Sequence, residues 1–302
     1  MLKANHAVRV GLRAASRNPE LGFARALLDQ GGNLIALLPM ALAAIFLFSI
    51  PLRAVLAALP ALQWTVAGAV AAAALIAFVA GMLFWAGALP LLAADAEMDR
   101  RPPPGNFALL ASRGFARVLG AGAIAYGLAI AFFLACSLGL FEAIPLAILA
   151  RRPSVIAGAA LVATAAIVGR MLIDLLGRLL LVRAAAFGDG IAAAFGKAAS
   201  LLGARFGACL VVTFAFFFLE LIAATAMGMI TGAISTSAGF DPGVELLALA
   251  PRIAAGLAAA AIFAWLEVGR MGALAAIAAD AEGLIETPAV AEPVVEALPV
   301  DQ

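Results

Sequence analysis

Long apolar runs separated by short polar connectors dominate the pattern of this chain. Six such runs carry almost no charge: 34–50, 66–94, 118–140, 155–168, 210–230 and 253–266. Roughly 20 apolar residues suffice to cross a hydrocarbon core about 30 Å thick. In lipid a helix satisfies all of its own backbone hydrogen bonds, so each run is expected to be helical. The pattern therefore predicts an all-α integral membrane protein with six transmembrane helices.

The chain also repeats itself with a period of roughly 92 residues, which is the length of one amphipathic helix plus two spans. Three pairs of segments match, each next to an apolar run: 22–25 with 114–117, 107–117 with 195–205, and 87–97 with 272–282. We predict three helical units, each with a surface helix, a span outward and a span back: 1–95, 96–184 and 185–282. The remaining residues, 283–302, form an acidic, proline-rich tail that is predicted to be disordered.

Prolines and cations fix the expected orientation. Prolines punctuate three short hairpin loops on one side of the membrane: Pro51 with Pro60, Pro145 with Pro153, and Pro242 with Pro251. That side carries only four cations: Arg53, Arg151, Arg152 and Arg252. The other side carries twelve: Lys3, Arg9, Arg13, Arg17, Arg25, Arg100, Arg101, Arg113, Arg117, Arg183, Lys197 and Arg205. Because short cytoplasmic connectors are enriched in Lys and Arg, we expect both termini to be cytoplasmic.

The first basic stretch has the periodicity of an amphipathic helix. One face carries His6, Arg9, Arg13 and Arg17, and the other carries Val8, Leu12 and Ala15. Such a helix can lie in the headgroup layer with its cations against anionic lipid. We take five cations as candidate lipid-headgroup contacts: Arg9, Arg13, Arg17, Arg117 and Arg205. Two alternatives stay open: the helices only frame the span ends, or they and the acidic tail dock a partner protein.

Ionisable residues within the spans are costly and suggest function. Glu220 lies in the fifth run, roughly 20 Å from its cytoplasmic end. Either it bonds to a neighbour such as Thr225 or pairs with another span, or it belongs to a proton, cation or substrate site.

Four more charges occupy the fourth and sixth spans near the cytoplasmic leaflet. Arg170 and Asp174 are one turn apart, and Glu267 and Arg270 lie at a similar depth. Unpaired charges would be expensive there, so we predict that Arg170 pairs with Glu267, and that Asp174 pairs with Arg270 or Arg178. The pairs would clamp the two spans together, or else line a polar translocation path.

Small residues on the fifth span favour close helix packing. The spacing appears as Gly203-x-x-x-Gly207 and Gly228-x-x-x-Gly232. It does not distinguish a contact within the chain from a contact between copies, so the oligomeric state stays open.

The composition and the absence of known catalytic motifs limit the classes of function that we expect. Of 302 residues, 66% are apolar and 12% charged, and the mean hydropathy is +1.12. The one histidine, His6, lies on the basic helix, and the sequence contains no P-loop, HExxH, GxSxG or CxxC motif. We therefore predict a protein that is not an enzyme, without catalytic residues, metal or cofactor, and with membrane lipid rather than nucleic acid as its partner.

The stretches 107–117 and 195–205, where an amphipathic helix ending in Arg enters a span, resemble a bacterial group of six-span proteins. This group includes the membrane domain attached to some glycerophosphoryl diester phosphodiesterases. The resemblance covers most of residues 1–282 and implies a location in the bacterial cytoplasmic membrane. The soluble catalytic domain of the phosphodiesterases has no counterpart here, so their activity is not carried over.

Two hypotheses for function follow. The first is a non-enzymatic multi-pass protein that organises lipid or partner proteins at the cytoplasmic membrane. The alternative is a transporter or channel for a small solute or ion that uses Glu220 with Arg170, Asp174 and Glu267. A transporter should have a polar cavity that reaches Glu220, whereas a scaffold should be a dry bundle.

Overall fold

The computed structural model describes residues 2–48, 60–98, 106–150, 153–238 and 242–285. Over these ranges the chain is all-helical, as predicted, and forms no strand. Five described helices are long and apolar enough to cross a membrane. The first predicted span falls in a helix whose side chains beyond residue 33 lie outside the described part, as do tail residues 286–302.

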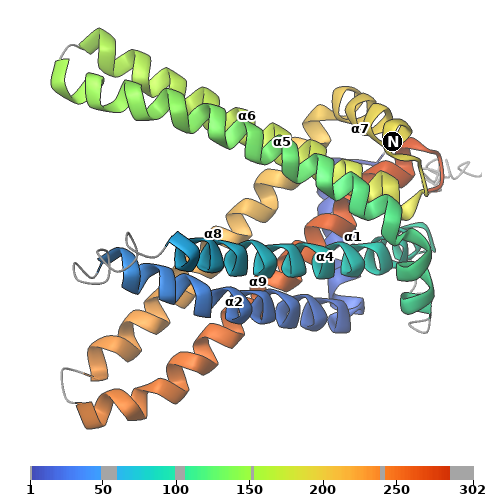
Figure 1. Cartoon of the computed structure of the whole chain (residues 1–302). Helices are drawn as coiled ribbons and strands as arrows, with labels where there is room; N and C mark the ends of the chain where they lie inside the picture. Colours follow the sequence, from blue (N-terminus) through green and yellow to red (C-terminus); the bar gives the residue numbers. More distant parts are fainter. Residues whose placement is uncertain (1, 49–59, 99–105, 151–152, 239–241, 286–302) are drawn as a thin grey trace, which may run out of the picture.

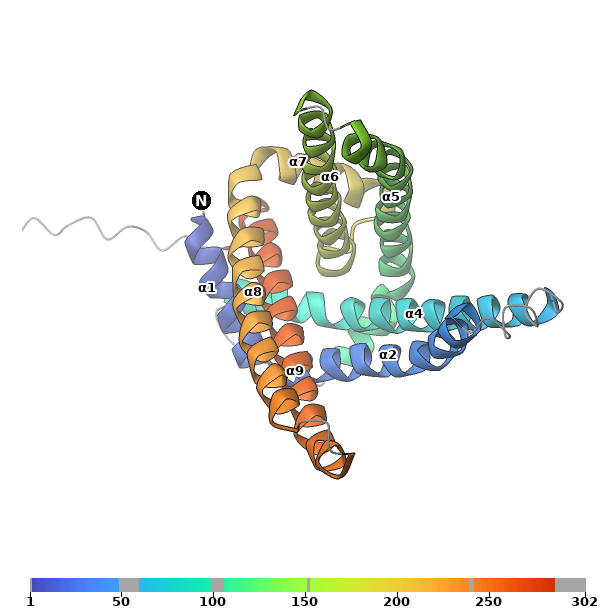
Figure 2. The same ribbon diagram turned by 90° about the vertical axis from the view of Figure 1, so that its left-hand side faces the viewer.

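Six long helices in the described ranges pack as three pairs. The pairs are α2 (Pro19–Phe48) with α4 (Pro60–Met98), α5 (Phe107–Ala150) with α6 (Pro153–Ala186), and α8 (Phe206–Ala238) with α9 (Pro242–Ala281). The short helices α1 (Ala4–Arg17) and α7 (Ile191–Ala204) lie at the end where the three pairs converge (Figure 1). The pairs diverge towards their loops, as Figure 2 also shows. The threefold internal repeat stays a prediction.

Proline marks the start of the second helix in each pair. Pro60, Pro153 and Pro242 are the first residues of α4, α6 and α9. Proline suits this position because its missing N–H would have no intrahelical partner there. Pro145 and Pro251 were expected in the loops, but they fall within the bounds of α5 and α9. Membrane helices tolerate proline because neighbouring groups satisfy the freed backbone carbonyl.

The three units differ at their basic helices. α1 ends at Arg17 because Asn18 precedes Pro19, and a residue before proline is pushed out of the helical region. α7 is likewise separate from α8, with Arg205 between them. In the second unit residues 107–117 are not a separate helix but the first turns of α5, which continue into the span. No proline interrupts that stretch.

α1 crosses α9 at almost direct backbone contact. A Cβ at Gly11 would lie 2.2 Å from the carbonyl oxygen of Gly269, so only glycine fits this crossing. The neighbouring Ala7, Ala14 and Ala15 on the same face are fully buried. The predicted amphipathic helix therefore exists, but its small apolar residues pack on protein.

The glycine pairs singled out on the fifth span make no comparable contact. A Cβ at any of the four would meet nothing within 4 Å in the described part of the chain: Gly203, Gly207, Gly228 and Gly232. These glycines therefore make no close helix contact within the described part of the chain, and a contact between copies stays a prediction. Close approach occurs instead at Gly269, where a Cβ would lie 2.9 Å from the Phe216 ring.

Burial changes along the helices. At the converging end, Leu89, Leu179 and Leu274 are fully buried in one core. Towards the loops, large apolar side chains such as Leu161 and Ile222 are mostly exposed. This surface matches a hydrocarbon environment, and the candidate site lies at the boundary between the two regions.

Candidate functional site

Eight ionisable residues from four helices form a charged cluster at this boundary. We call the following set the charged cluster: Arg25 and Asp29 of α2, Arg170, Asp174 and Arg178 of α6, Glu220 of α8, and Glu267 and Arg270 of α9. Every helix pair contributes at least two of them. Four arginines balance four carboxylates, so the formal net charge of the cluster is zero.

Glu267 links the three helix pairs. Its Oε2 accepts a hydrogen bond from Arg25 Nε at 2.8 Å, and its Oε1 lies 3.8 Å from Arg178 Nη1. The three side chains are only 15 to 24% exposed. In such an environment a charge pair interacts more strongly than in water, and loss of one partner is costly. One carboxylate thus joins α2, α6 and α9.

Arg25 is held from three directions. Besides Glu267, it forms an ion pair with Asp29 one turn along α2, at 3.1 Å. Its guanidinium also lies 5.5 Å from the centre of the Trp85 ring, at cation–π distance. Sequence reasoning treated Arg25 only as a connector cation and missed Asp29. The available signal was the repeated tetrapeptide, which ends in Arg25.

Glu220 forms an ion pair with Arg270, so α8 is tied to α9 within one pair. This is the interhelical salt bridge left open from the sequence. Thr225 is not its partner, since the Thr225 hydroxyl donates to the carbonyl of Leu221. Arg270 is nearly buried, and its Nε has no hydrogen-bond partner among the described residues.

The crossed pairing predicted for the fourth and sixth spans is half right. Asp174 pairs with Arg178 at 2.7 Å, as one alternative predicted. The pairing of Arg170 with Glu267 is wrong, because Arg25 and Arg178 occupy that carboxylate. Arg170 is exposed, and within the described ranges it forms no ion pair.

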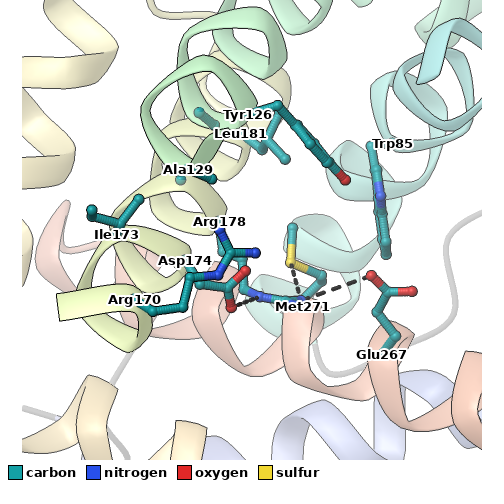
Figure 3. A pocket seen from close by; sticks show the side chains of 12 residues that line it. Trp85, Tyr126, Ala129, Arg170, Ile173, Asp174, Arg178, Leu181, Glu267 and Met271 are labelled. Carbon is teal, nitrogen blue, oxygen red and sulfur yellow. Dashed lines mark hydrogen bonds and ion pairs between the residues drawn. The ribbon is translucent and has the colours of Figure 1, made fainter. Parts of the chain in front are cut away.

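A cavity of about 140 Å³ opens beside these charges. Its polar and aromatic lining comes from α4, α5, α6 and α9: Trp85, Tyr126, Arg170, Asp174, Arg178 and Glu267. Figure 3 shows Arg170, Asp174 and Arg178 on one side, with Trp85, Tyr126 and Glu267 on the other. The cavity therefore offers charged groups of both signs. Glu220 does not line it.

At least three of the five candidate headgroup cations are engaged within the protein. Arg17 pairs with Asp95 at 3.1 Å, and Arg205 pairs with Asp280 at 2.8 Å. Arg117 donates to the carbonyl of Gly188 at the end of α6. Arg9 and Arg13 on α1 have exposed side chains.

The fold and the site define a helical protein with helices of membrane-spanning length and an internal charged cluster. Comparison of the chain with protein-family models, with curated proteins and with solved structures finds no match. The resemblance to the phosphodiesterase membrane domains therefore stays a prediction. In the part of the chain that the structure describes, no three His, Cys, Asp or Glu residues form a group that could hold a metal ion.

Proposed function

We propose that this protein is a membrane carrier that binds a small zwitterionic solute in the cavity of the charged cluster. The observation that carries the proposal is the polar lining of that cavity, with Arg170 outside every ion pair of the described cluster. Ion pairs that only hold the helices together would require no cavity beside them. The cavity does not reach Glu220, as the sequence-based transporter hypothesis required, so the proposal places the binding site at Arg170 and Glu267 instead.

The balance of charges favours a solute with both signs. Arg170 offers an unshared guanidinium to a phosphate or carboxylate group. On the opposite side, Glu267 and the Tyr126 ring offer a carboxylate and an aromatic face to an ammonium group. A solute of single charge would leave an uncompensated charge at low exposure, which costs free energy. A solute that carries both an anionic and a cationic group meets an opposite charge on each side of the cavity.

The ion pairs also suggest how the helix pairs could move. Arg178 lies between two carboxylates, at 2.7 Å from Asp174 and 3.8 Å from Glu267. A bound ammonium group would compete with Arg178 and Arg25 for Glu267, and would thereby loosen the link between the three pairs. We assign the present arrangement to a state that is closed at the converging end and open towards the loops. Binding energy would then be coupled to a change between two states.

Uptake into proteoliposomes tests this function. We expect wild-type vesicles to accumulate radiolabelled phosphoethanolamine above empty vesicles, and Arg170→Gln to lower uptake at least tenfold. Arg113→Gln removes the same charge from an exposed position on α5 and should leave uptake unchanged. Unlabelled phosphoethanolamine should compete better than inorganic phosphate or ethanolamine. Uptake equal to that of empty vesicles would reject the proposal.

A second function has its own supporting observation, the exposed polar face of α1. Arg9 and Arg13 are exposed while the opposite face is fixed on α9 at Gly11. The cations could thus hold anionic lipid headgroups at the membrane surface. Arg9→Gln combined with Arg13→Gln should lower the amount of anionic lipid that co-purifies, as measured by mass spectrometry. An unchanged amount would remove this role.

A further inference from the structure

An apolar groove of about 700 Å³ adjoins the charged cavity. The two spaces share Trp85 and Tyr126 in their walls, so they meet at these side chains. The groove lies between α4 and α5, and Arg25 and Asp29 of α2 line one part of it. The rest of its lining is mostly small or apolar, including Ala74, Leu75 and Ile130. Leu75 and Ile130 are 61% and 58% exposed, so no described part of the chain covers them fully.

We infer that the solute is an amphiphile whose zwitterionic head occupies the charged cavity while its single acyl chain occupies the groove. This inference rests on the proposed function and names the substrate class. Charge complementarity selects the head, because the neutral cluster presents Arg170 and Glu267 to opposite sides of one cavity. Because Trp85 and Tyr126 line both the cavity and the groove, the acyl chain of a bound solute would continue from the cavity into the groove.

The length of the groove is sufficient for one acyl chain. The groove lining on α4 extends from Ala71 to Trp85, and a helix of that length rises about 21 Å. One leaflet of a hydrocarbon core is about 15 Å thick, so the groove is long enough for a chain from one leaflet. The small residues Ala74 and Gly127 on the facing helices leave room between them. A Cβ at Gly127 would meet nothing within 4 Å.

Tryptophan fluorescence tests the groove directly. The chain has three tryptophans, and Trp64→Phe with Trp265→Phe leaves Trp85 at the junction as the sole tryptophan. This variant is placed in nanodiscs of phosphatidylglycerol, and lysophosphatidylethanolamine with a brominated chain is added as a quencher. We expect saturable quenching of Trp85, at least threefold stronger than with brominated lysophosphatidylglycerol, whose head is anionic.

Two glycine variants separate a specific groove from ordinary lipid contact. Gly127→Leu fills the groove and should lower the quenching at least threefold, whereas Gly158→Leu on α6 lies outside it and should change nothing. Equal, non-saturating quenching by both lipids that is insensitive to Gly127→Leu would overturn the inference. In that case, Arg170-dependent uptake of phosphoethanolamine would show that the carrier function stands. If neither specific quenching of Trp85 nor Arg170-dependent uptake is observed, both the amphiphile substrate and the carrier function are rejected.

Discussion

Arg25 Nε on α2 lies 2.8 Å from Glu267 Oε2 on α9, although 242 residues separate them in the sequence. The same carboxylate also reaches Arg178 on α6. One side chain therefore couples three helix pairs that diverge from each other towards their loops. Any motion of one pair against the others must change the partners of Glu267.

The Arg25–Glu267 pair should show strong thermodynamic coupling. Each single variant, Arg25→Gln or Glu267→Gln, should lower stability by about 2 kcal/mol, since each removes a charged hydrogen bond at low exposure. The double variant should cost at least about 1 kcal/mol less than the sum of the two. Thermal unfolding in detergent provides the measurement. The matched cycle of Arg170→Gln with Glu267→Gln should be additive, and coupling there instead would contradict the observed pairing.

The Glu220–Arg270 pair makes a narrower prediction. Arg270→Gln leaves the Glu220 carboxylate without its cation and should cost about 2 kcal/mol of stability. Adding Glu220→Gln should recover part of this loss, because the uncompensated charge is removed. The order of thermal midpoints is thus wild type, double variant, Arg270→Gln. A double variant less stable than Arg270→Gln would show that the two side chains do not compensate each other.

The crossing of α1 and α9 depends on Gly11. Gly11→Ala places a Cβ against the Gly269 carbonyl and should lower stability by about 2 to 3 kcal/mol through overpacking. Gly158→Ala is the control, because nothing lies within 4 Å of its Cβ position. That change should raise stability by about 0.5 to 1 kcal/mol through helix propensity. A neutral Gly11→Ala would show that α1 is not docked on α9.

Asp189 lies between α6 and α7, outside the spans, and its ionisation should make the stability of the protein depend on pH. Burial of this carboxyl favours a higher pKa, but hydrogen bonds and charges from Lys197 and Arg183 outweigh it and hold the pKa below its ordinary value of 3.8. Because the folded state lowers this pKa, the stabilisation is complete above the unfolded value and is lost as pH falls through the folded value.

The comparison with Asp189→Asn measures this effect. At neutral pH the variant should have the lower thermal midpoint. The gap should persist down to a pH of about 4 and close below it, as wild-type Asp189 takes up its proton. A gap that stays the same from a pH of about 7 to a pH of about 2 would mean that the stabilisation by Asp189 does not come from a lowered pKa.

Sequence reasoning predicted the helical class and the paired spans because apolar runs report directly on the membrane environment. It also found Glu220, Arg170, Asp174, Glu267 and Arg270, since an ionisable residue stands out within an apolar run. It offered one correct partner, Arg178 for Asp174, and missed the others, because pairing between helices depends on which helix faces which. That relationship is set by the crossings of helices and not by depth along one span.

Two features of the structure were not predicted from the sequence. Arg25 and Asp29 precede the first predicted apolar run, so nothing in the pattern marked them as interior groups. α1 was expected to present its apolar face at the membrane surface, yet Gly11 lets it dock against Gly269. A glycine that permits close approach looks the same in sequence as Gly228, which meets nothing in the described chain. Asp95 and Asp280 occupy matching positions of the predicted repeat and both bind an arginine, but the threefold repeat stays a prediction.

Access of a charged reagent to the cavity tests the carrier proposal most directly. Ala129→Cys lines the cavity, and Ile167→Cys is a control on α6 outside it, with a side chain 64% exposed on the apolar surface. Both are placed in a background without the natural cysteines Cys136 and Cys209. We expect a methanethiosulfonate carrying a trimethylammonium group to modify Ala129→Cys much faster than Ile167→Cys. We also expect phosphoethanolamine to slow the modification of Ala129→Cys. Equal, slow modification of both cysteines, unaffected by phosphoethanolamine, would contradict the carrier proposal.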